Sequence, residues 1–448
     1  MQQNIINIKA LDMEGRGVGH VANEDGSQGK VIFVEGALPG ERVSFQSYRK
    51  KAKWEAADMT QLHRESSSRV KPQCAHFGIC GGCAMQHLEP SAQVAMKQRV
   101  LEDNLWHLSK LKAEIMLRPI YGPTWGYRYR ARISVKHVLK RGTVLVGFHE
   151  KKSAYVSDMN TCDILPPHVS AMLMPLRQLI ASLSLIDRLP QIELAIGEGD
   201  DGKQVTAMVL RVMDPPTIDD EAKLRAFADQ YDVQWWLQSK GPDTAKPFYP
   251  AQSTLHYKLP EFGIRMPFKP TDFTQVNHQI NRVLVARALR LLDVQPNDRV
   301  ADLFCGLGNF TLPIATLACE VVGIEGSTAL TERAADNAKI NGVDEKTAFY
   351  CRNLFEATSG DFVALGKFDR MLIDPPREGA LEVCKAIATV PEAIKPRRIV
   401  YVSCNPATLA RDAGELVAHG GYRLSMAGVV NMFPHTAHVE SMAVFDLL

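Results

Sequence analysis

The stretch that decides the fold is Arg299-Val300-Ala301-Asp302-Leu303-Phe304-Cys305-Gly306-Leu307-Gly308-Asn309-Phe310. Its apolar first half is typical of a short buried strand, and its two glycines are typical of a tight turn into a helix. Two later apolar runs also stop at polar or proline-rich turns, Asp374-Pro375-Pro376-Arg377 and Ser403-Cys404-Asn405-Pro406. Ligands bind at the carboxyl ends of the strands in open α/β sheets, so the three turns predict one site.

The chain around these turns alternates between strand-like and helix-like patterns. An amphipathic helix is predicted from Gln275 onward, with apolar positions at Val276, Ile280, Val283, Leu284, Ala288 and Leu291. The alternation that follows it predicts a doubly wound parallel sheet.

The glycine loop is suited to a nucleotide-type cofactor. Gly306 and Gly308 allow close approach of the backbone to a ligand, and Glu325 follows at the end of the next predicted strand, where ribose hydroxyls are usually held. A plain strand-to-helix turn is the alternative reading. The third glycine of a dinucleotide site is absent, which favours S-adenosylmethionine over NAD.

Length and composition predict a multi-domain cytoplasmic protein. The chain has 448 residues, a formal net charge of +2 and nine cysteines. A chain of that length is too long to fold around a single compact core. Because the net charge is nearly neutral, any nucleic-acid-binding surface must be a local patch of positive charge. Neither a signal sequence nor a membrane-spanning apolar run is present, and no obligate protein partner is evident. We therefore expect the cysteines to be thiols, ligands or catalysts and not disulfides, with Cys319 and Cys384 buried as small apolar residues.

The pattern changes twice along the chain and predicts three domains. Residues 1–67 contain short strand-like runs with glycine turns, which predict a small β-barrel. Residues 68–270 are expected to form a central α+β domain, and residues 271–448 the α/β sheet domain.

A cysteine cluster lies in the predicted central domain. Cys74, Cys80 and Cys83 are joined by glycines, and Cys162 follows about eighty residues later. Four thiolates suit an iron–sulfur cluster or zinc, and the spacing alone does not separate the two. Chance clustering is the remaining alternative.

Five motifs, taken together, resemble those of the RNA uracil-5-methyltransferases. They are Phe273-Thr274-Gln275-Val276-Asn277, Asp302 through Phe310, Asp374 through Arg377, Ser403 through Pro406, and His438-Val439-Glu440. The resemblance implies a Rossmann-like fold that binds S-adenosyl-L-methionine, with Cys404 as nucleophile and Glu440 as base. It implies that the cofactor is held by Gln275, Phe304, Asn309, Glu325, Asn353 and Asp374. One branch of the family has a similar cysteine spacing, which implies a [4Fe–4S] cluster on Cys74, Cys80, Cys83 and Cys162.

The chemistry of uracil methylation needs such a nucleophile and base. Addition of a thiolate at C6 makes C5 electron-rich, and a carboxylate can then remove the C5 proton. The alternative for Cys404 is a buried apolar thiol, although the Asn-Pro that follows places it at a chain reversal. For Glu440 the alternative is a solvated carboxylate, which the residue alone would favour.

The predicted barrel resembles a TRAM domain, an OB-like RNA-binding module. Its expected RNA face comprises Phe45, Tyr48, Arg49, Lys50, Lys51, Lys53 and Trp54. A second basic and aromatic run lies at residues 127–132, whereas Lys151 and Lys152 read as a solvated face.

Barrel, cluster and sheet together resemble the branch that methylates uracil 1939 of 23S ribosomal RNA. Alternatives are a different rRNA or tRNA uridine, a radical-SAM enzyme and a non-catalytic RNA-binding protein. The cysteine spacing disfavours the radical-SAM reading, which requires three and two residues between its cysteines.

Overall fold

The computed structural model describes residues 4–22 and 28–448, so residues 1–3 and 23–27 of the predicted barrel domain lie outside the described residues. The chain divides into two compact units. The first unit contains Met1–Val100, Phe148–Ser157 and Phe433–His438. The second contains Leu101–Gly147, Asp158–Met432 and Val439–Leu448.

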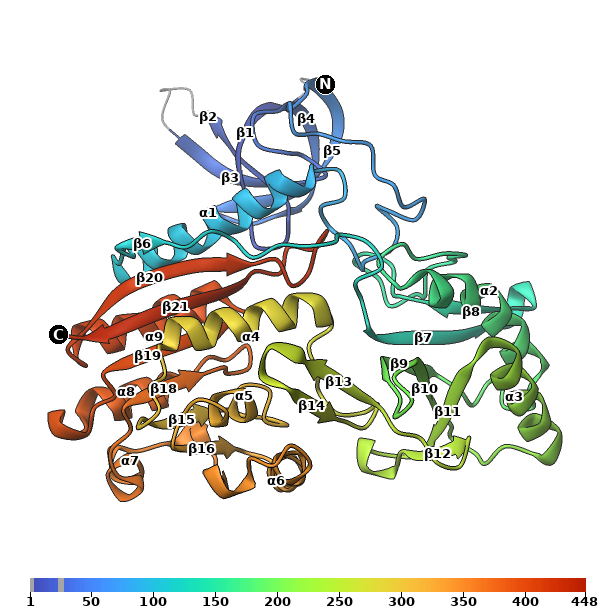
Figure 1. Ribbon diagram of the computed structural model, residues 1–448. Helices are drawn as coiled ribbons and strands as arrows, with labels where there is room; N and C mark the ends of the chain where they lie inside the picture. Colours follow the sequence, from blue (N-terminus) through green and yellow to red (C-terminus); the bar gives the residue numbers. More distant parts are fainter. Residues whose placement is uncertain (1–3, 23–27) are drawn as a thin grey trace. The chain divides into compact units, whose positions relative to one another are not determined.

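The first unit contains a closed five-stranded barrel, as predicted (Figure 1). Side chains alternate between buried and exposed along β1, and Ile6, Ile8, Val34 and Val43 meet inside the barrel. The strands, joined in the order β1-β2-β3-β5-β4, are β1 Ile5–Leu11, β2 Gly17–Ala22, β3 Gln28–Glu35, β4 Arg42–Lys50 and β5 Trp54–Arg64. The helix α1, Pro90–Ser109, runs from the first unit into the second.

A first sheet of the second unit is mixed. Its order is β12-β11-β10-β9-β13-β14, with β7 paired to both β8 and β9. The strands are β7 Arg130–Val138, β8 Thr143–Gly147, β9 Gln191–Glu198, β10 Gln204–Arg211, β11 Val233–Gln238, β12 Lys246–Tyr249, β13 His256–Leu259 and β14 Ile264–Pro267. The helices α2 (Pro167–Ser182) and α3 (Ile218–Tyr231) accompany this sheet.

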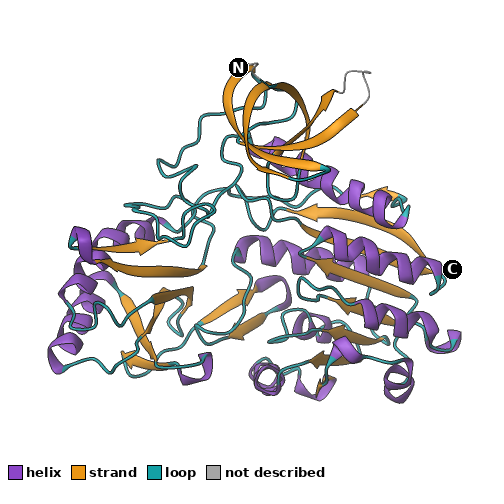
Figure 2. Ribbon diagram, turned by 180° about the vertical axis from the view of Figure 1, so that it is seen from behind, coloured by secondary structure: helices purple, strands orange, loops and turns teal. Residues whose placement is uncertain are grey.

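The second sheet of this unit confirms the predicted doubly wound architecture. Its order is β17-β16-β15-β18-β19-β21-β20-β6, and the first five strands run parallel. The antiparallel strand β21 inserts between β19 and β20. Helices lie on both faces of the sheet (Figures 1 and 2). The strands are β6 Ile115–Met116, β15 Arg299–Leu303, β16 Glu320–Glu325, β17 Thr347–Cys351, β18 Arg370–Ile373, β19 Arg398–Ser403, β20 Tyr422–Val430 and β21 Glu440–Leu447.

Side-chain caps begin three of the helices around this sheet, α4, α7 and α9. The Asn277 side chain accepts a hydrogen bond from the Ile280 amide at the start of α4, which buries Ile280, Leu284 and Ala288 but leaves Val283 exposed. The helices are α4 His278–Leu292, α5 Thr311–Ala315, α6 Thr328–Ile340, α7 Ser359–Leu365, α8 Leu381–Thr389 and α9 Pro406–Ala418. Short 3₁₀ turns occur at Leu139–Arg141, Pro242–Thr244, Pro260–Phe262, Asp344–Lys346, Leu354–Glu356 and Glu392–Ile394. None of the helices in the described ranges has the length and apolar character needed to cross a membrane.

Candidate active site

The strands that carry the predicted site residues end at one edge of the second sheet. Leu303 of β15 pairs with Ile373 of β18, and Ile373 pairs with Tyr401 of β19. The turns that begin at Phe304, Asp374 and Cys404 therefore leave the sheet on the same side, as the sequence predicted.

Cys404 and Glu440 come from neighbouring antiparallel strands. Ser403 pairs with Ser441, and the next step of this register places Cys404 opposite Glu440. The Ser441 hydroxyl donates to the Ser403 carbonyl at 3.2 Å and fastens the strands at this point. Glu440 is buried, whereas Cys404 is partly exposed. The thiol is thus accessible beside a carboxyl that is withdrawn from water.

The turn after Cys404 is tied to the turn after β18. Asn405 caps α9 by accepting a hydrogen bond from the Ala407 amide at 3.1 Å, and its Nδ2 donates to the Arg377 carbonyl at 3.1 Å. The sequence motif suggested a chain reversal here but not this cross-link. It holds the Asp374–Arg377 turn beside the thiol.

Burial and like charge act together on the ionisable groups of this edge. Burial, followed by the carboxyls of Glu440 and Asp374, raises the pKa of Cys404 to about 12, while the Arg377 guanidinium acts in the opposite direction. Burial and then Asp374 hold the pKa of Glu440 well above its usual range. Burial also raises the pKa of Asp374 to about 7. The thiol, both carboxyls and Arg377 therefore share one electrostatic environment.

The glycine loop and Glu325 are joined by a hydrogen bond. The Gly306 amide donates to Glu325 Oε2 at 3.2 Å, and the Ser327 amide donates to Oε1 of the same carboxylate at 3.2 Å. Gly308 has a φ of +91°, and a Cβ there would lie 2.3 Å from Leu312 Cδ1. Phe304 is unusual for a non-glycine residue because its φ is +62°. The loop thus has a backbone conformation that larger residues tolerate poorly at Gly308.

Asn309 lies in a hydrogen-bond network that the sequence did not reveal. Its Oδ1 accepts from the Tyr257 hydroxyl at 2.8 Å and from Asn281 Nδ2 at 2.9 Å. Tyr257 comes from the first sheet and Asn281 from α4, so elements far apart in the chain fix this side chain. No local pattern could have signalled these partners.

Gln275 lies in the loop before α4, where it is partly buried. Beside it, Thr274 Oγ1 and Asn277 Nδ2 are buried without a hydrogen-bond partner in the described structure. One Asp302 carboxylate oxygen accepts from Thr311, and the other is also unpartnered there. Buried polar atoms of this kind are costly unless something else satisfies them.

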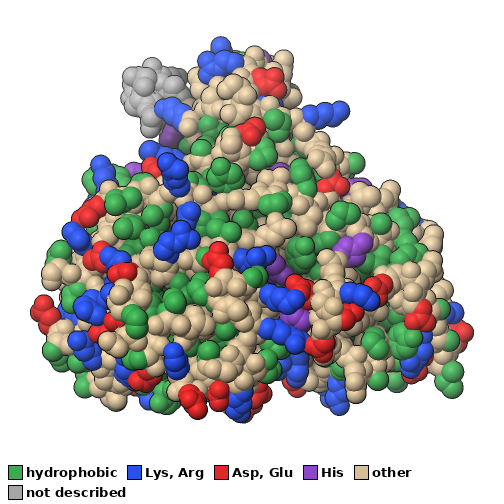
Figure 3. Space-filling model, viewed as in Figure 1, with side chains coloured by type: hydrophobic (Ala, Val, Ile, Leu, Met, Phe, Trp, Pro, Cys, Tyr) green, Lys and Arg blue, Asp and Glu red, His purple; other side chains and the backbone are tan. Residues whose placement is uncertain are grey.

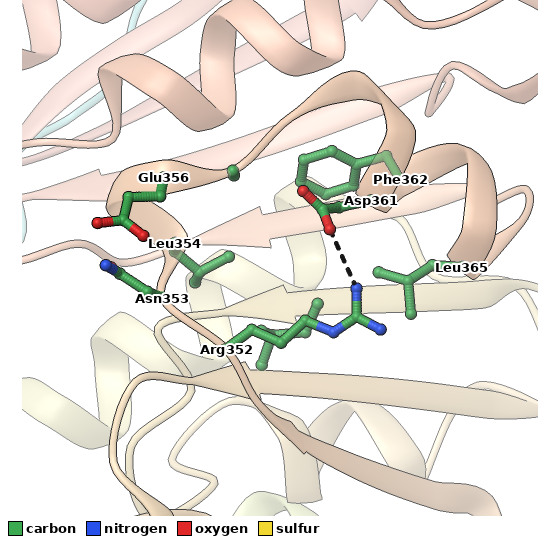
Figure 4. A pocket seen from close by; sticks show the side chains of 9 residues that line it. Arg352, Asn353, Leu354, Glu356, Asp361, Phe362 and Leu365 are labelled. Atoms are coloured by element: carbon green, nitrogen blue, oxygen red, sulfur yellow. Dashed lines mark ion pairs between the residues drawn. The ribbon is translucent and has the colours of Figure 1, made fainter.

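A cavity of about 440 Å³ lies next to Asn353. It is lined by Ile324 of β16, by the chain after β17 and by α7. Figure 4 shows the Arg352 guanidinium directed at Asp361, 3.6 Å away, with Asn353 and Glu356 at the other end of the group. Asn353 also caps a 3₁₀ turn by accepting from the Phe355 amide at 3.1 Å. One lining residue, Ile324, directly precedes Glu325, and its carbonyl accepts a hydrogen bond from the Cys305 amide of the glycine loop at 3.1 Å.

Cys74, Cys80 and Cys83 belong to the first unit, and Cys162 belongs to the second. The Gly82 amide donates to Cys80 Sγ at 3.4 Å. Among residues 4–22 and 28–448, no group of three or more His, Cys, Asp or Glu side chains is arranged to hold a metal ion. The metal site therefore stays a prediction.

Two other cysteine expectations have different outcomes. Cys384 is buried, as expected. The expectation for Cys319 was wrong, because its thiol is exposed and donates to the Asp298 carbonyl at 3.1 Å. Cys319 stands just before β16, where the chain is still on the surface.

The barrel surface also differs from expectation at two places. Phe45 points into the barrel core and is not part of an outer face. Lys151 and Lys152 are not simply solvated, because they form ion pairs with Glu35 at 2.6 and 3.3 Å. Arg49 remains on the outer surface, with its guanidinium 5.5 Å from the centre of the Trp54 ring.

Comparison with known proteins agrees with this geometry. The family model described as tRNA (Uracil-5-)-methyltransferase matches residues 90–446. A protein of Cupriavidus pinatubonensis named 23S rRNA (uracil(1939)-C(5))-methyltransferase RlmD is 66% identical over 445 residues, which are 99% of this chain and 95% of that protein. A protein of the same name from Ralstonia pickettii is 64% identical over 447 residues, 98% of each chain.

A solved structure shares the fold at lower identity. The Pyrococcus abyssi tRNA (uracil-54, C5)-methyltransferase, in complex with S-adenosyl-L-homocysteine, has a TM-score of 0.71 and 23% identity, over 98% of this chain and 99% of that one. The resemblance expected from the motifs is therefore confirmed, and the chain belongs to the tRNA (uracil-5-)-methyltransferase family.

Proposed function

We propose that this protein transfers a methyl group from S-adenosyl-L-methionine to C5 of uracil 1939 in 23S ribosomal RNA. The main support for this reaction is the strand register that places Cys404 opposite Glu440. Asp374 is close enough to raise the pKa of Glu440. The choice of substrate is supported by the names of the relatives that are 64–66% identical over nearly the whole chain. Because 23S ribosomal RNA lies in the bacterial cytoplasm, we expect the protein to act there.

Cys404 and Glu440 divide the reaction between them. The Cys404 sulfur forms a bond to C6 of the uracil, which moves electron density onto C5. The cofactor supplies the methyl group that C5 takes up. Glu440 then accepts the C5 proton, and the bond between sulfur and C6 breaks, which restores the double bond and the thiolate. The carboxyl must therefore lie next to the thiol, as it does across β19 and β21.

The residues near the glycine loop fit the proposed cofactor. Glu325 would receive the ribose hydroxyls, and the cavity beside Asn353 has room for an adenine ring. The unpartnered atoms at Thr274 and Asn277 flank Gln275, which suits a polar ligand there. We assign cofactor contacts to Gln275, Phe304, Asn309, Glu325, Asn353 and Asp374.

We further propose a [4Fe–4S] cluster on Cys74, Cys80, Cys83 and Cys162. Support comes from the donor chemistry, since four thiolates suit such a cluster, and from the amide of Gly82 that donates to the Cys80 sulfur. Anaerobically purified protein should contain about four irons per chain. Stoichiometric zinc in colourless protein would contradict the cluster.

The three predicted domains would have separate tasks in this scheme. Residues 1–67 would bind RNA as a TRAM-like barrel, residues 68–270 would carry the cysteine site, and residues 271–448 would bind the cofactor and catalyse. The barrel is closed, and the exposed Arg49 lies over the partly buried Trp54 ring, which supports an RNA-binding role.

A methyl-transfer assay tests the function directly. The protein is incubated with labelled S-adenosyl-L-methionine and an unmodified 23S ribosomal RNA fragment containing uracil 1939, and the product is mapped by nuclease digestion. We expect 5-methyluridine at that position. The matched control is the same fragment with cytidine at 1939, which should take up no label. Label at another uridine, or in a tRNA only, would refute the proposed substrate. Absence of any label would refute the proposed methyltransferase activity.

A further inference from the structure

We propose that an exposed strip of the second unit, made by Arg118, Tyr121, Arg282, Arg287 and Arg290, binds the single-stranded RNA that flanks the target nucleotide. This inference rests on the proposed function. It adds a surface outside the barrel, the cysteine cluster and the catalytic motifs. We call it the α4 strip.

The first observation is where Tyr121 leaves the sheet. Cys404 lies opposite Glu440, Glu440 pairs with Val430, and Val430 forms a bridge with Ile120. These four residues form one row across the sheet. Neighbouring strands are about 4.8 Å apart, so Ile120 lies roughly 14 Å from Cys404.

Tyr121 follows Ile120 directly. It is 71% exposed and directly follows the row of residues that contains Cys404 and Glu440. An exposed aromatic ring offers a face on which a nucleic-acid base can stack. At this distance the partner would be a base near the methylated one.

The second observation is that α4 runs alongside this segment. A Cβ on Gly122 would lie 3.1 Å from Ile280 Cδ1, so the two segments touch near the start of the helix. Further along the helix, Arg287 Nη1 donates to the Arg118 carbonyl. The segment from Arg118 to Gly122 and the helix from Ile280 to Arg287 thus form one continuous surface.

The third observation is the charge of that surface. Arg118, Arg282 and Arg290 are exposed, and Arg287 is partly buried. Within the described ranges none of the four forms an ion pair with a carboxylate, whereas Arg299 of the same unit pairs with Glu320 at 2.9 Å. Burial, and to a smaller degree the positive charge of nearby Arg290, lower the pKa of Arg287. In Figure 3, Lys and Arg side chains lie over the part of the surface where Figure 1 draws α4.

Cations next to an exposed aromatic ring favour single-stranded nucleic acid. Guanidinium groups contact phosphates, and the ring stacks on a base without reading its identity. The whole chain has a net charge of only +2, so a run of four uncompensated arginines is a local departure that an acidic ligand explains. The direction of the strip, from the far end of α4 to Tyr121 at the catalytic edge, suits a strand that ends at the target.

The test measures steady-state methyl transfer with the full-length protein and the 23S ribosomal RNA fragment. Tyr121→Ala should raise the KM for RNA roughly fivefold or more and leave kcat nearly unchanged, because stacking contributes to binding and not to the chemical step. Tyr121→Phe keeps the ring and should stay within about twofold of the parent. A Tyr121→Ala protein with the parent KM would overturn the proposal.

Charge is tested by a salt series of RNA-binding measurements. Arg282→Gln with Arg290→Gln should weaken binding and reduce the slope of log affinity against log salt by about 0.7 for each phosphate that the variant no longer binds. The matched control is Lys339→Gln with Lys346→Gln, which removes two exposed cations near the opposite edge of the sheet. If the slope of log affinity against log salt is the same for both double variants, the proposal is wrong. The α4 strip would then be a candidate binding surface for an acidic protein. Failure of the parent to methylate RNA would instead refute the proposed function.

Discussion

The Lys152 ammonium lies 3.9 Å from the centre of the Tyr48 ring, above its face. The same nitrogen is 3.3 Å from Glu35 and 3.4 Å from Asp58, and all three partners belong to the barrel. Lys151 adds a further ion pair to Glu35, while its backbone amide donates to the Ile79 carbonyl at 2.7 Å. These two lysines therefore join the barrel to the loop that carries Cys80, and one face of Tyr48 is already occupied.

Replacing both lysines, by Lys151→Gln and Lys152→Gln, should loosen this junction. Although burial opposes it, Lys151 and Lys152 hold the pKa of Glu35 below its ordinary value. A depressed carboxyl pKa stabilises the fold above the unfolded-state value, near 4.3, and that contribution disappears as pH falls through the folded-state value. Amide hydrogen exchange of residues 79–81 and 149–151 should therefore become several-fold faster at pH 7. The difference from the parent should shrink on acidification, and a constant difference would contradict this account.

The barrel lysines make a separate prediction about RNA. Lys50, Lys51 and Lys53 lie at the turn between β4 and β5 and are exposed. Changing all three to Gln should weaken RNA binding and reduce its salt dependence by about 0.7 log units for each phosphate released from the protein. Turnover at saturating RNA should hardly change, since phosphate contacts position the substrate without touching the reacting base. If the RNA affinity and its salt dependence do not change, this turn does not contact RNA and is an ordinary solvated surface.

The two proposed catalytic residues should fail in different ways. Cys404→Ala should reduce methyl transfer to background while cofactor binding persists, because the thiol acts on the base. Glu440→Gln should slow turnover by about 10² to 10⁴-fold and let the methylated RNA accumulate as a covalent adduct. A denaturing gel detects that adduct as a shifted band. Substantial turnover by the Cys404→Ala variant would refute the assignment of Cys404 as the nucleophile.

The reactivity of Cys404 should depend on its charged neighbours. Burial and then Glu440 raise the pKa of this thiol, and Arg377 lowers it. Glu440→Gln should therefore move the pH midpoint of Cys404 alkylation by iodoacetamide downward, and Arg377→Met should move it upward. Rates are measured by mass spectrometry of the peptide that contains Cys404. If the pH midpoint of alkylation does not move in either variant, neither Glu440 nor Arg377 affects the pKa of the Cys404 thiol.

Glu41 is expected to be the most sensitive carboxylate of the first unit. It is fully buried, accepts from Arg69 Nε at 2.6 Å and from the Leu38 amide at 2.8 Å. Burial opposes ionisation, but Arg69 and the backbone donors lower its pKa overall. Glu41→Gln removes the anionic partner of Arg69, which keeps only its bond to the Gly36 carbonyl, and should destabilise the barrel by about 3 kcal/mol, seen as faster exchange of barrel amides. Glu221→Gln, which breaks an exposed pair on α3, should cost less than about 0.5 kcal/mol.

The sequence predicted the second sheet well because its signals are local. Apolar runs that stop at Asp374 and Cys404 mark strand ends, and strand ends at a common edge imply a common site. Partners that come from distant elements were not predictable in this way, as Tyr257 and Asn281 beside Asn309 demonstrate. Phe45 was misread for a related reason, since its contacts with core residues of other barrel strands decide which way it faces, and the local composition does not reveal them. The paired role of Lys151 and Lys152 depends on acids more than ninety residues away in the chain.

The insertion of β21 between β19 and β20 has a consequence for how the enzyme is made. A growing chain produces β19 and β20 first, but these strands are not neighbours in the folded sheet, because β21 lies between them. Until then Cys404, the proposed nucleophile, lacks Glu440, its proposed base, and the sheet lacks the strand between β19 and β20. Protein synthesis adds roughly 5–20 residues per second, so the stretch from the end of β20 at Val430 to the end of β21 at Leu447 takes roughly one to three seconds. A product that stops before β21 lacks the strand that carries Glu440. The order of strands thus makes catalytic competence a late event, reached only when the sheet itself is closed.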